Sequence, residues 1–231
     1  MKQISKFSLI TLMLLSAFNI NAQDEQPLQL GIRGGVNISN FGGDDIKYDD
    51  NTKFDDKTAL VGYMAGITLD YQLASAIYLQ TGLDFTTKGA KFESGSNLLS
   101  GSLKYTPMYI QLPVHIAFKL PLTESLKIVL GGGGFAAYGV GGKVKSTLNP
   151  GDSSLNLPES DFFGDNTFKK FDYGIGINAG VELGKLTVGV GYDLGLANIA
   201  QDEFKMGDVS ISNSKNKVRT QNAYAAVGFR F

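Results

Sequence analysis

The chain ends with Asn222-Ala223-Tyr224-Ala225-Ala226-Val227-Gly228-Phe229-Arg230-Phe231, in which apolar residues alternate with polar or small ones. This period of two predicts a β-strand with one apolar face. A bilayer tolerates such a strand only when every backbone group is paired, and a closed barrel achieves that pairing. The end of the chain therefore makes a membrane β-barrel the first hypothesis for the fold.

The N-terminal segment predicts secretion. Lysines precede an apolar run at 7–18, and Ala22 supplies a small residue for cleavage. The run is too short to span a bilayer as a helix. We therefore expect residues 1–22 to be a signal peptide and residues 23–231 to form one outer-membrane β-barrel domain. An uncleaved anchor helix is the alternative.

Composition excludes several classes of site. The chain has no cysteine, which excludes disulfides, thiolate catalysis and cysteine-ligated metals. Its formal net charge is −1, so no overall field favours nucleic acid, and we expect no nucleic-acid partner. After the signal, no apolar run approaches the roughly 20 residues of a membrane helix. A mature chain that spans a membrane must therefore do so with strands.

Eight segments alternate with period two, at about 28–39, 59–72, 76–87, 105–120, 125–141, 170–184, 186–198 and 219–231. The connections between them alternate in length. Short turns occupy 73–75, 121–124 and 184–185, whereas long polar connections occupy 40–58, 88–104, 142–169 and 199–218. This rhythm is typical of long loops on one rim and tight turns on the other. We therefore predict an all-β, eight-stranded antiparallel up-and-down transmembrane β-barrel.

The two faces of the predicted strands differ in charge. One face is apolar from Leu28 to Leu196 and from Ala223 to Phe231 and carries no charged residue there. The other face carries His115 and the strand charges Arg33, Asp70, Asp84, Lys119, Lys127, Asp172, Glu182, Asp193 and Arg230. Periodicity alone does not say which face is inside, and a soluble secreted ligand-binding barrel would turn the apolar face inward. So many apolar side chains would overfill an eight-stranded interior, so we expect them to face lipid.

The charges on the lumen face predict a network. Buried charges must be paired because isolated ones are strongly unfavourable. Arg33 and Arg230 lie on adjacent strands once the barrel closes, and the carboxylates on the same face supply counter-charges. We expect Arg33, Asp70, Asp84, His115, Lys119, Asp172, Glu182, Asp193 and Arg230 to fill the lumen as a plug. A path for protons or small ions is the alternative interpretation.

Three motifs suggest chemistry but have simpler interpretations. The glycine run at 131–134 is not followed by Lys-Ser/Thr, and it predicts a bend or a close backbone approach. His115 is the one histidine, and no strand has a serine in a nucleophile motif, so we expect His115 to act as a hydrogen-bond partner. The aspartates of 40–58 lack EF-hand spacing, which favours a solvated acidic loop. We therefore expect no catalytic, metal or cofactor site.

Two prolines fall inside the fourth predicted strand. Pro107 and Pro113 each remove a ladder hydrogen bond, and a closed barrel has no free edge to accommodate the loss. Each proline therefore predicts a bulge or an irregular register.

Aromatic residues gather toward both ends of the apolar face. Tyr71, Phe118, Phe229 and Phe231 lie near the turns, and Phe85, Tyr138, Phe171 and Tyr173 lie toward the long connections. Two interfacial girdles of this kind are typical of membrane barrels, although aromatic residues also favour strands in general. We expect Phe229 and Phe231 to act as a C-terminal insertion signal for the barrel-insertion machinery.

The segment Tyr109-Ile110-Gln111-Leu112-Pro113-Val114-His115-Ile116-Ala117-Phe118-Lys119 resembles a signature strand of the PorT-like outer-membrane β-barrel family. The segment Gly31-Ile32-Arg33-Gly34-Gly35-Val36-Asn37 resembles the first strand of that family, and Phe231 supplies the usual aromatic end. The resemblance covers nearly all of the mature chain, and the alternation is shared with OmpX-like barrels. It implies an eight-stranded barrel in the outer membrane of a Gram-negative bacterium, without enzyme activity.

These patterns together predict a non-enzymatic integral outer-membrane β-barrel protein with four long surface loops. Its role would be structural or adhesive, or accessory to secretion or transport. The expected partners are outer-membrane lipid, the barrel-insertion machinery and a surface or secretion partner bound through the loops. A membrane-embedded hydrolase is disfavoured because the nucleophile motif is missing.

Overall fold

The computed structural model describes residues 27–42, 56–96, 99–150, 155–156, 158–163, 168–200, 203–206, 209–212 and 218–231. The predicted signal peptide at 1–22 and most of the acidic segment 40–58 lie outside the described residues. Within these ranges, no helix has the length and apolar character needed to cross a membrane.

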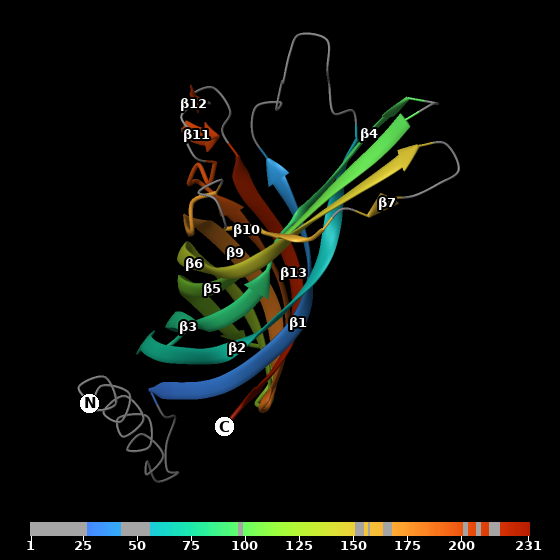
Figure 1. The fold of residues 1–231 in the computed structure, drawn as a ribbon. Helices are drawn as coiled ribbons and strands as arrows, with labels where there is room; N and C mark the ends of the chain where they lie inside the picture. Colours follow the sequence, from blue (N-terminus) through green and yellow to red (C-terminus); the bar gives the residue numbers. More distant parts are fainter. Residues whose placement is uncertain are drawn as a thin grey trace, which may run out of the picture.

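Long antiparallel strands close into a ring (Figure 1). In the described part of the chain the ring has eight members: β1 (Leu28–Gly42), β2 (Asp56–Ala74), β3 (Ile77–Thr87), β5 (Leu99–Pro121), β6 (Leu126–Pro150), β9 (Phe171–Leu183), β10 (Leu186–Gly195) and β13 (Arg219–Arg230). Each strand pairs with the next in this order. The first pairs with the last, with Arg33 opposite Gly228. The predicted eight-stranded up-and-down barrel is confirmed.

Short strands extend the barrel at one end. β4 (Ala90–Ser96) pairs with both β5 and β2, and β7 (Leu155–Asn156) and β8 (Ser160–Asp161) pair with β6. β11 (Glu203–Met206) and β12 (Val209–Ser212) form a separate hairpin. In Figure 1, β4, β7, β11 and β12 lie beyond the end of the barrel that is opposite the C-terminus. We call this the loop side and the other end the turn side.

The prediction of polar loops at 88–104 and 142–169 is wrong over much of both ranges. β4 occupies part of the first, and β5 and β6 pair from Leu99 opposite Pro150 to Pro121 opposite Lys127, with one register shift. These strands have 23 and 25 residues, whereas a bilayer needs about 9–11. Beyond the lipid, the outer face of a strand meets water, so the apolar alternation ends while the hydrogen-bonded ladder continues.

The apolar face of the barrel points outward, as predicted. Side chains at mid-barrel such as Ile67, Ile177 and Val190 are 51%, 65% and 57% exposed. The exposed aromatics Tyr71, Phe118, Phe229 and Phe231 lie on the turn side, and Tyr138, Phe171 and Tyr173 lie toward the loop side. A soluble barrel would turn this belt inward, so the soluble ligand-binding alternative does not fit the structure.

One of the two prolines of β5 disturbs the register as predicted. Pro107 precedes a register shift between Met108 and Tyr109 in the pairing with β6. At Pro113 the predicted irregularity is wrong, because Val114 opposite Thr81 and Gln111 opposite Asp84 keep one register with β3. Gly133 confirms the expected close approach, because a Cβ there would collide with the carbonyl oxygen of Val114. The glycine run therefore has a structural role in β6.

An apolar cluster closes the loop side of the barrel. We call it the apolar cap, and its buried members are Phe41, Ala90, Phe92, Phe162, Ala197, Ile199, Ala200 and Val218. Phe162 stacks on Phe168 with ring centroids 4.3 Å apart. Phe163 packs on the cap and also on Tyr109 and Phe135, which are buried within the barrel. The cap is not evident in the sequence, because its members come from segments far apart in the chain.

Candidate functional site: the charged lumen

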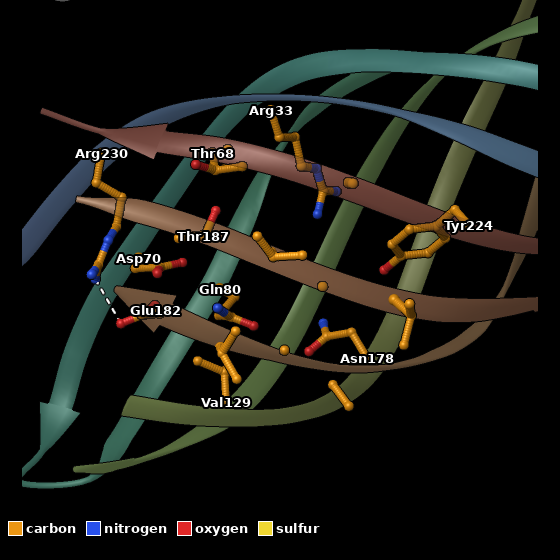
Figure 2. A pocket seen from close by; sticks show the side chains of 18 residues that line it. Arg33, Thr68, Asp70, Gln80, Val129, Asn178, Glu182, Thr187, Tyr224 and Arg230 are labelled. Atoms are coloured by element: carbon orange, nitrogen blue, oxygen red, sulfur yellow. Dashed lines mark ion pairs between the residues drawn. The ribbon is translucent and has the colours of Figure 1, made fainter. Parts of the chain in front are cut away.

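The lumen charges form three groups along the barrel axis. The first group, on the turn side, is centred on the buried Lys119. Its Nζ lies 2.5 Å from Asp70 Oδ2 and 2.7 Å from Glu182 Oε1. Arg230 Nη1 lies 2.8 Å from Glu182 Oε2 and donates a hydrogen bond of 2.7 Å to Gln29 Oε1. Figure 2 shows the pair formed by Arg230 and Glu182. We call these residues the turn-side layer.

The second group crosses the middle of the barrel, and we call it the septum: Arg33, Asp84, Gln111, His115, Asn178 and Asp193. Arg33 Nε donates to Asp84 Oδ1 at 2.8 Å, and Arg33 Nη2 contacts the other carboxylate oxygen. Gln111 Nε2 donates to Asp193 Oδ2 at 2.9 Å. Asn178 Nδ2 lies 2.9 Å from His115 Nδ1. Side chains from β1, β3, β5, β9 and β10 therefore meet across the lumen.

The third group, the loop-side layer, contains a lysine that sequence analysis missed. Lys88 Nζ lies 3.3 Å from Asp172 Oδ2, to which Thr220 Oγ1 also donates at 2.7 Å. The ammonium group lies 4.5 Å from the ring centroid of Phe135 and 5.3 Å from that of Tyr109. The sequence places Lys88 in the segment 88–104, which it predicts to be a polar connection. The signal that could have found it is its spacing, because it continues the inward positions of β3 by two residues beyond Thr86.

Little space remains between these groups. A cavity of about 110 Å³ lies between the turn-side layer and the septum, and Figure 2 shows Arg33, Tyr224 and Asn178 directed into it. Two smaller cavities of about 50 Å³ and about 10 Å³ lie around His115. Arg33 lines all three cavities. No group of three or more histidine, aspartate or glutamate side chains in the described ranges is placed to hold a metal ion.

The predicted lumen residues do face the interior, but they do not form one continuous cluster. Lys119 joins Asp70 and Glu182, and Arg230 joins the same glutamate. Arg33 with Asp84, and Asp172 with Lys88, form separate pairs. Phe229 and Phe231 lie outside, exposed on the turn side, with ring centroids 5.8 Å apart in an edge-to-face arrangement.

Comparison with known proteins gives a family match and several remote structural likenesses. Residues 21–201 match a family model described as an outer membrane protein beta-barrel domain. No curated protein sequence matches the chain significantly. The structural likenesses have TM-scores below 0.5, so they say nothing about what this chain binds.

Three solved structures illustrate these likenesses. Ail, the attachment invasion locus protein of Yersinia pestis, is 14% identical over 89% of this chain and 100% of that chain, with a TM-score of 0.34. Neisserial surface protein A is 12% identical over 87% of this chain and 97% of that chain, with a TM-score of 0.42. OprG from Pseudomonas aeruginosa is 15% identical over 91% of this chain and 99% of that chain, with a TM-score of 0.40.

Proposed function

Because this chain belongs to the family of outer membrane protein beta-barrel domains, we propose that it is a non-enzymatic, non-conducting barrel that presents a β-sheet at the cell surface to a partner. An integral barrel of the Gram-negative outer membrane offers two places for function, its lumen and its surface segments. The contacts within the lumen favour a filled interior. The length of β5 and β6 favours the surface segments as the functional part.

The plug interpretation is supported by the ion pairs that cross the lumen. An eight-stranded barrel is only wide enough for side chains to fill its interior. Lys119 pairs with Asp70 and Glu182 on the turn side, and Lys88 pairs with Asp172 on the loop side. The apolar cap lies beyond the loop-side layer. A continuous water column would have to pass all of these contacts.

The observation that carries the proposal is the sheet that rises beyond the lipid. We call it the extramembrane sheet: β4, residues 99–107 of β5 and residues 141–150 of β6. Tyr105 and Val144 lie opposite each other and pack on the apolar cap. Lys104 and Lys145, the next opposed pair, are exposed on the outer face. The sheet therefore has a packed inner face and an exposed, charged outer face, which suits the binding of a partner.

Glu159 fastens the segment before β8 to this sheet. Its carboxylate oxygens lie 2.9 Å from Lys143 Nζ and 2.6 Å from Lys145 Nζ. These hydrogen bonds hold the pKa of Glu159 at about 2, below its ordinary value. The outer face therefore carries charges of both signs, which favours a polar or charged partner over an apolar one.

The class of partner follows from the family resemblance. The likeness of 109–119 and 31–37 to PorT-like barrels supports a role accessory to secretion or transport, and a structural or adhesive role is the second candidate. A hydrolase is not supported, because His115 contacts Asn178 rather than a serine. We propose that Phe229 and Phe231 address the chain to the barrel-insertion machinery.

A photo-crosslinking residue at Lys104 tests the surface role in intact cells. We expect covalent adducts with a protein or a surface polymer at Lys104. At Val190, which is 57% exposed on the lipid face, we expect adducts with lipid alone. A second variant replaces residues 91–104 by a tight turn, because Ala90 and Tyr105 are opposed. This variant should keep heat-modifiable migration. As a competitor of the chain that carries the crosslinker, it should not reduce the adducts formed at Lys104. Lipid adducts alone at both sites would contradict the proposal.

Planar bilayer recording tests the plug. We expect no stable porin-sized conductance from the purified barrel, because the lumen is interrupted at three levels. The lumen-facing glycines Gly66 and Gly191 lie against side chains, because a Cβ at either would come within 2.3 Å of Asp84 or Tyr224. A reproducible open-channel current from the monomer, abolished by enlarging either glycine, would overturn the plug assignment.

A further inference from the structure

The septum contains one carboxylate more than its cations balance. Asp84 and Asp193 are 1% and 3% exposed, and Arg33 is engaged with Asp84. The hydrogen-bond donor to Asp193 is the neutral amide of Gln111. Among the described residues, no ion pair joins Asp193 to a lysine or an arginine. Because an isolated buried carboxylate is strongly unfavourable, the geometry calls for one further positive charge beside Asp193.

A second observation points to the same place. The cavity of about 10 Å³ in the septum is lined by Gln111, His115, Asp193 and Asn222. Three buried atoms there have no protein hydrogen-bond partner: Gln111 Oε1, His115 Nε2 and Asn222 Oδ1. Buried polar atoms in folded proteins are nearly always paired. A cavity of about 10–15 Å³ is the size that one water molecule needs, and one water can reach several such atoms.

Gly176 brings the histidine and the carboxylate together. A Cβ at this position of β9 would lie 2.5 Å from Asp193 Oδ1 and 3.1 Å from His115 Nε2. A Cβ there would displace the Asp193 carboxylate, so with glycine the imidazole and the carboxylate pack against the same backbone atom. The glycine therefore lets the two groups interact directly or through a single water molecule.

We propose that the septum is a proton-binding site in which His115 becomes an imidazolium and supplies the missing charge beside Asp193. In the neutral ring, Nδ1 accepts from Asn178 Nδ2, so the ring proton lies on Nε2 and points toward the cavity. The added proton binds Nδ1, and the Asn178 amide turns so that its oxygen accepts from it. Both ring nitrogens then donate, one to Asn178 and the other toward Asp193.

A proton fits this site better than a metal cation. Arg33 lines the same cavity and repels a second fixed cation, whereas a proton on the ring requires no added volume. The charged groups facing His115 act in both directions. Asp193 of β10 and Asp84 of β3 favour the imidazolium, as does Asp70 of β2 from the neighbouring cavity, and Arg33 of β1 opposes it. Tyr224 of β13 also lines the site.

Nitrogen NMR of the histidine ring tests this proposal without ambiguity, because the chain has one histidine. In lipid bilayers, we expect both ring-nitrogen signals of the wild type to move to the imidazolium position as the pH falls from about 8 to about 5, the range in which histidine titrates. In Asp193→Asn the same change should require a lower pH, because the attracting charge is gone. Gln80→Asn, also in the lumen, serves as the matched control.

Three results would overturn the proposal. One is a ring that stays neutral across this range, and another is an unchanged titration in Asp193→Asn. The third is a spectrum that responds to added Na⁺ at constant pH, which would assign the site to a metal cation instead. If Asp193→Asn fails to fold, urea unfolding of the wild type and of His115→Gln replaces it. The urea resistance of the wild type should change with pH through the histidine range, and the resistance of His115→Gln should not follow that change; equal pH dependence of the two would overturn the proposal.

Discussion

Lys88 Nζ lies 3.3 Å from Asp172 Oδ2, and neither side chain is more than 1% exposed. This ion pair joins the segment between β3 and β4 to β9 at the level where the charged lumen meets the apolar cap. Thr220 of β13 donates to the same carboxylate oxygen at 2.7 Å. Three parts of the chain that are distant in sequence are therefore tied together by one buried carboxylate.

Replacing Lys88 by methionine should leave Asp172 charged, buried and unpaired. Breaking a buried pair in this way costs about 3–5 kcal/mol, and urea unfolding of the barrel in lipid vesicles measures the loss. The double variant Lys88→Met/Asp172→Asn should recover much of it, because no buried charge remains. Lys104→Met, at an exposed lysine, is the control. If the free energy of unfolding of Lys88→Met changed by less than about 1 kcal/mol, the pair would contribute little to stability.

An arginine on the lipid face should impair insertion. Val190 is 57% exposed at mid-strand in β10, and arginine at the bilayer midplane costs about 2–4 kcal/mol. We expect Val190→Arg to decrease the free energy of unfolding in lipid vesicles by that amount. The lumen variant Gln80→Asn should change it far less. Equal folding of Val190→Arg and the wild type would mean that lipid does not contact this face.

Truncating the terminal aromatic should reduce assembly in cells. We expect Phe231→Ser to lower the yield of heat-modifiable barrel in the outer membrane, because the insertion machinery loses one of its two proposed contacts. Phe171→Ser removes an aromatic that is also exposed, 55% against 65% for Phe231, but lies on the opposite rim. This control should assemble at nearly the wild-type level. A similar defect in both variants would assign Phe231 to the aromatic girdle alone.

The attachment of the segment before β8 to the extramembrane sheet should weaken at low pH. The pKa of Glu159 is lowered from 4.5 to about 2 by Lys145 and Lys143. A carboxylate with a lowered pKa stabilises the folded state at any pH above its pKa in the unfolded chain. That contribution is lost as the pH falls from about 4.5 through 2. The protection of the Val144 and Ser160 amides against hydrogen exchange, relative to an unfolded chain at the same pH, should therefore fall in this window. In Glu159→Gln the exchange should already be faster at neutral pH and should lack the acid step.

The sequence by itself determined the barrel and the orientation of its strands. A period of two places alternate residues on opposite faces, and lipid admits only one kind of residue on the face that it touches. Asp70, Asp84, Glu182 and Asp193 could therefore be assigned to the lumen without a structure. The positions of the short turns followed from the same alternation, because each turn interrupts it.

The tertiary structure alone decided what the chain does outside the lipid and how the lumen charges are divided. The extramembrane sheet has no lipid to impose a pattern on its outer face, so Lys104 and Lys145 resemble loop residues in the sequence. The apolar cap joins Phe41 to Phe162, and the ion pair of Lys88 with Asp172 spans the barrel. Such contacts depend on strand register and closure, which bring together residues that no local period relates.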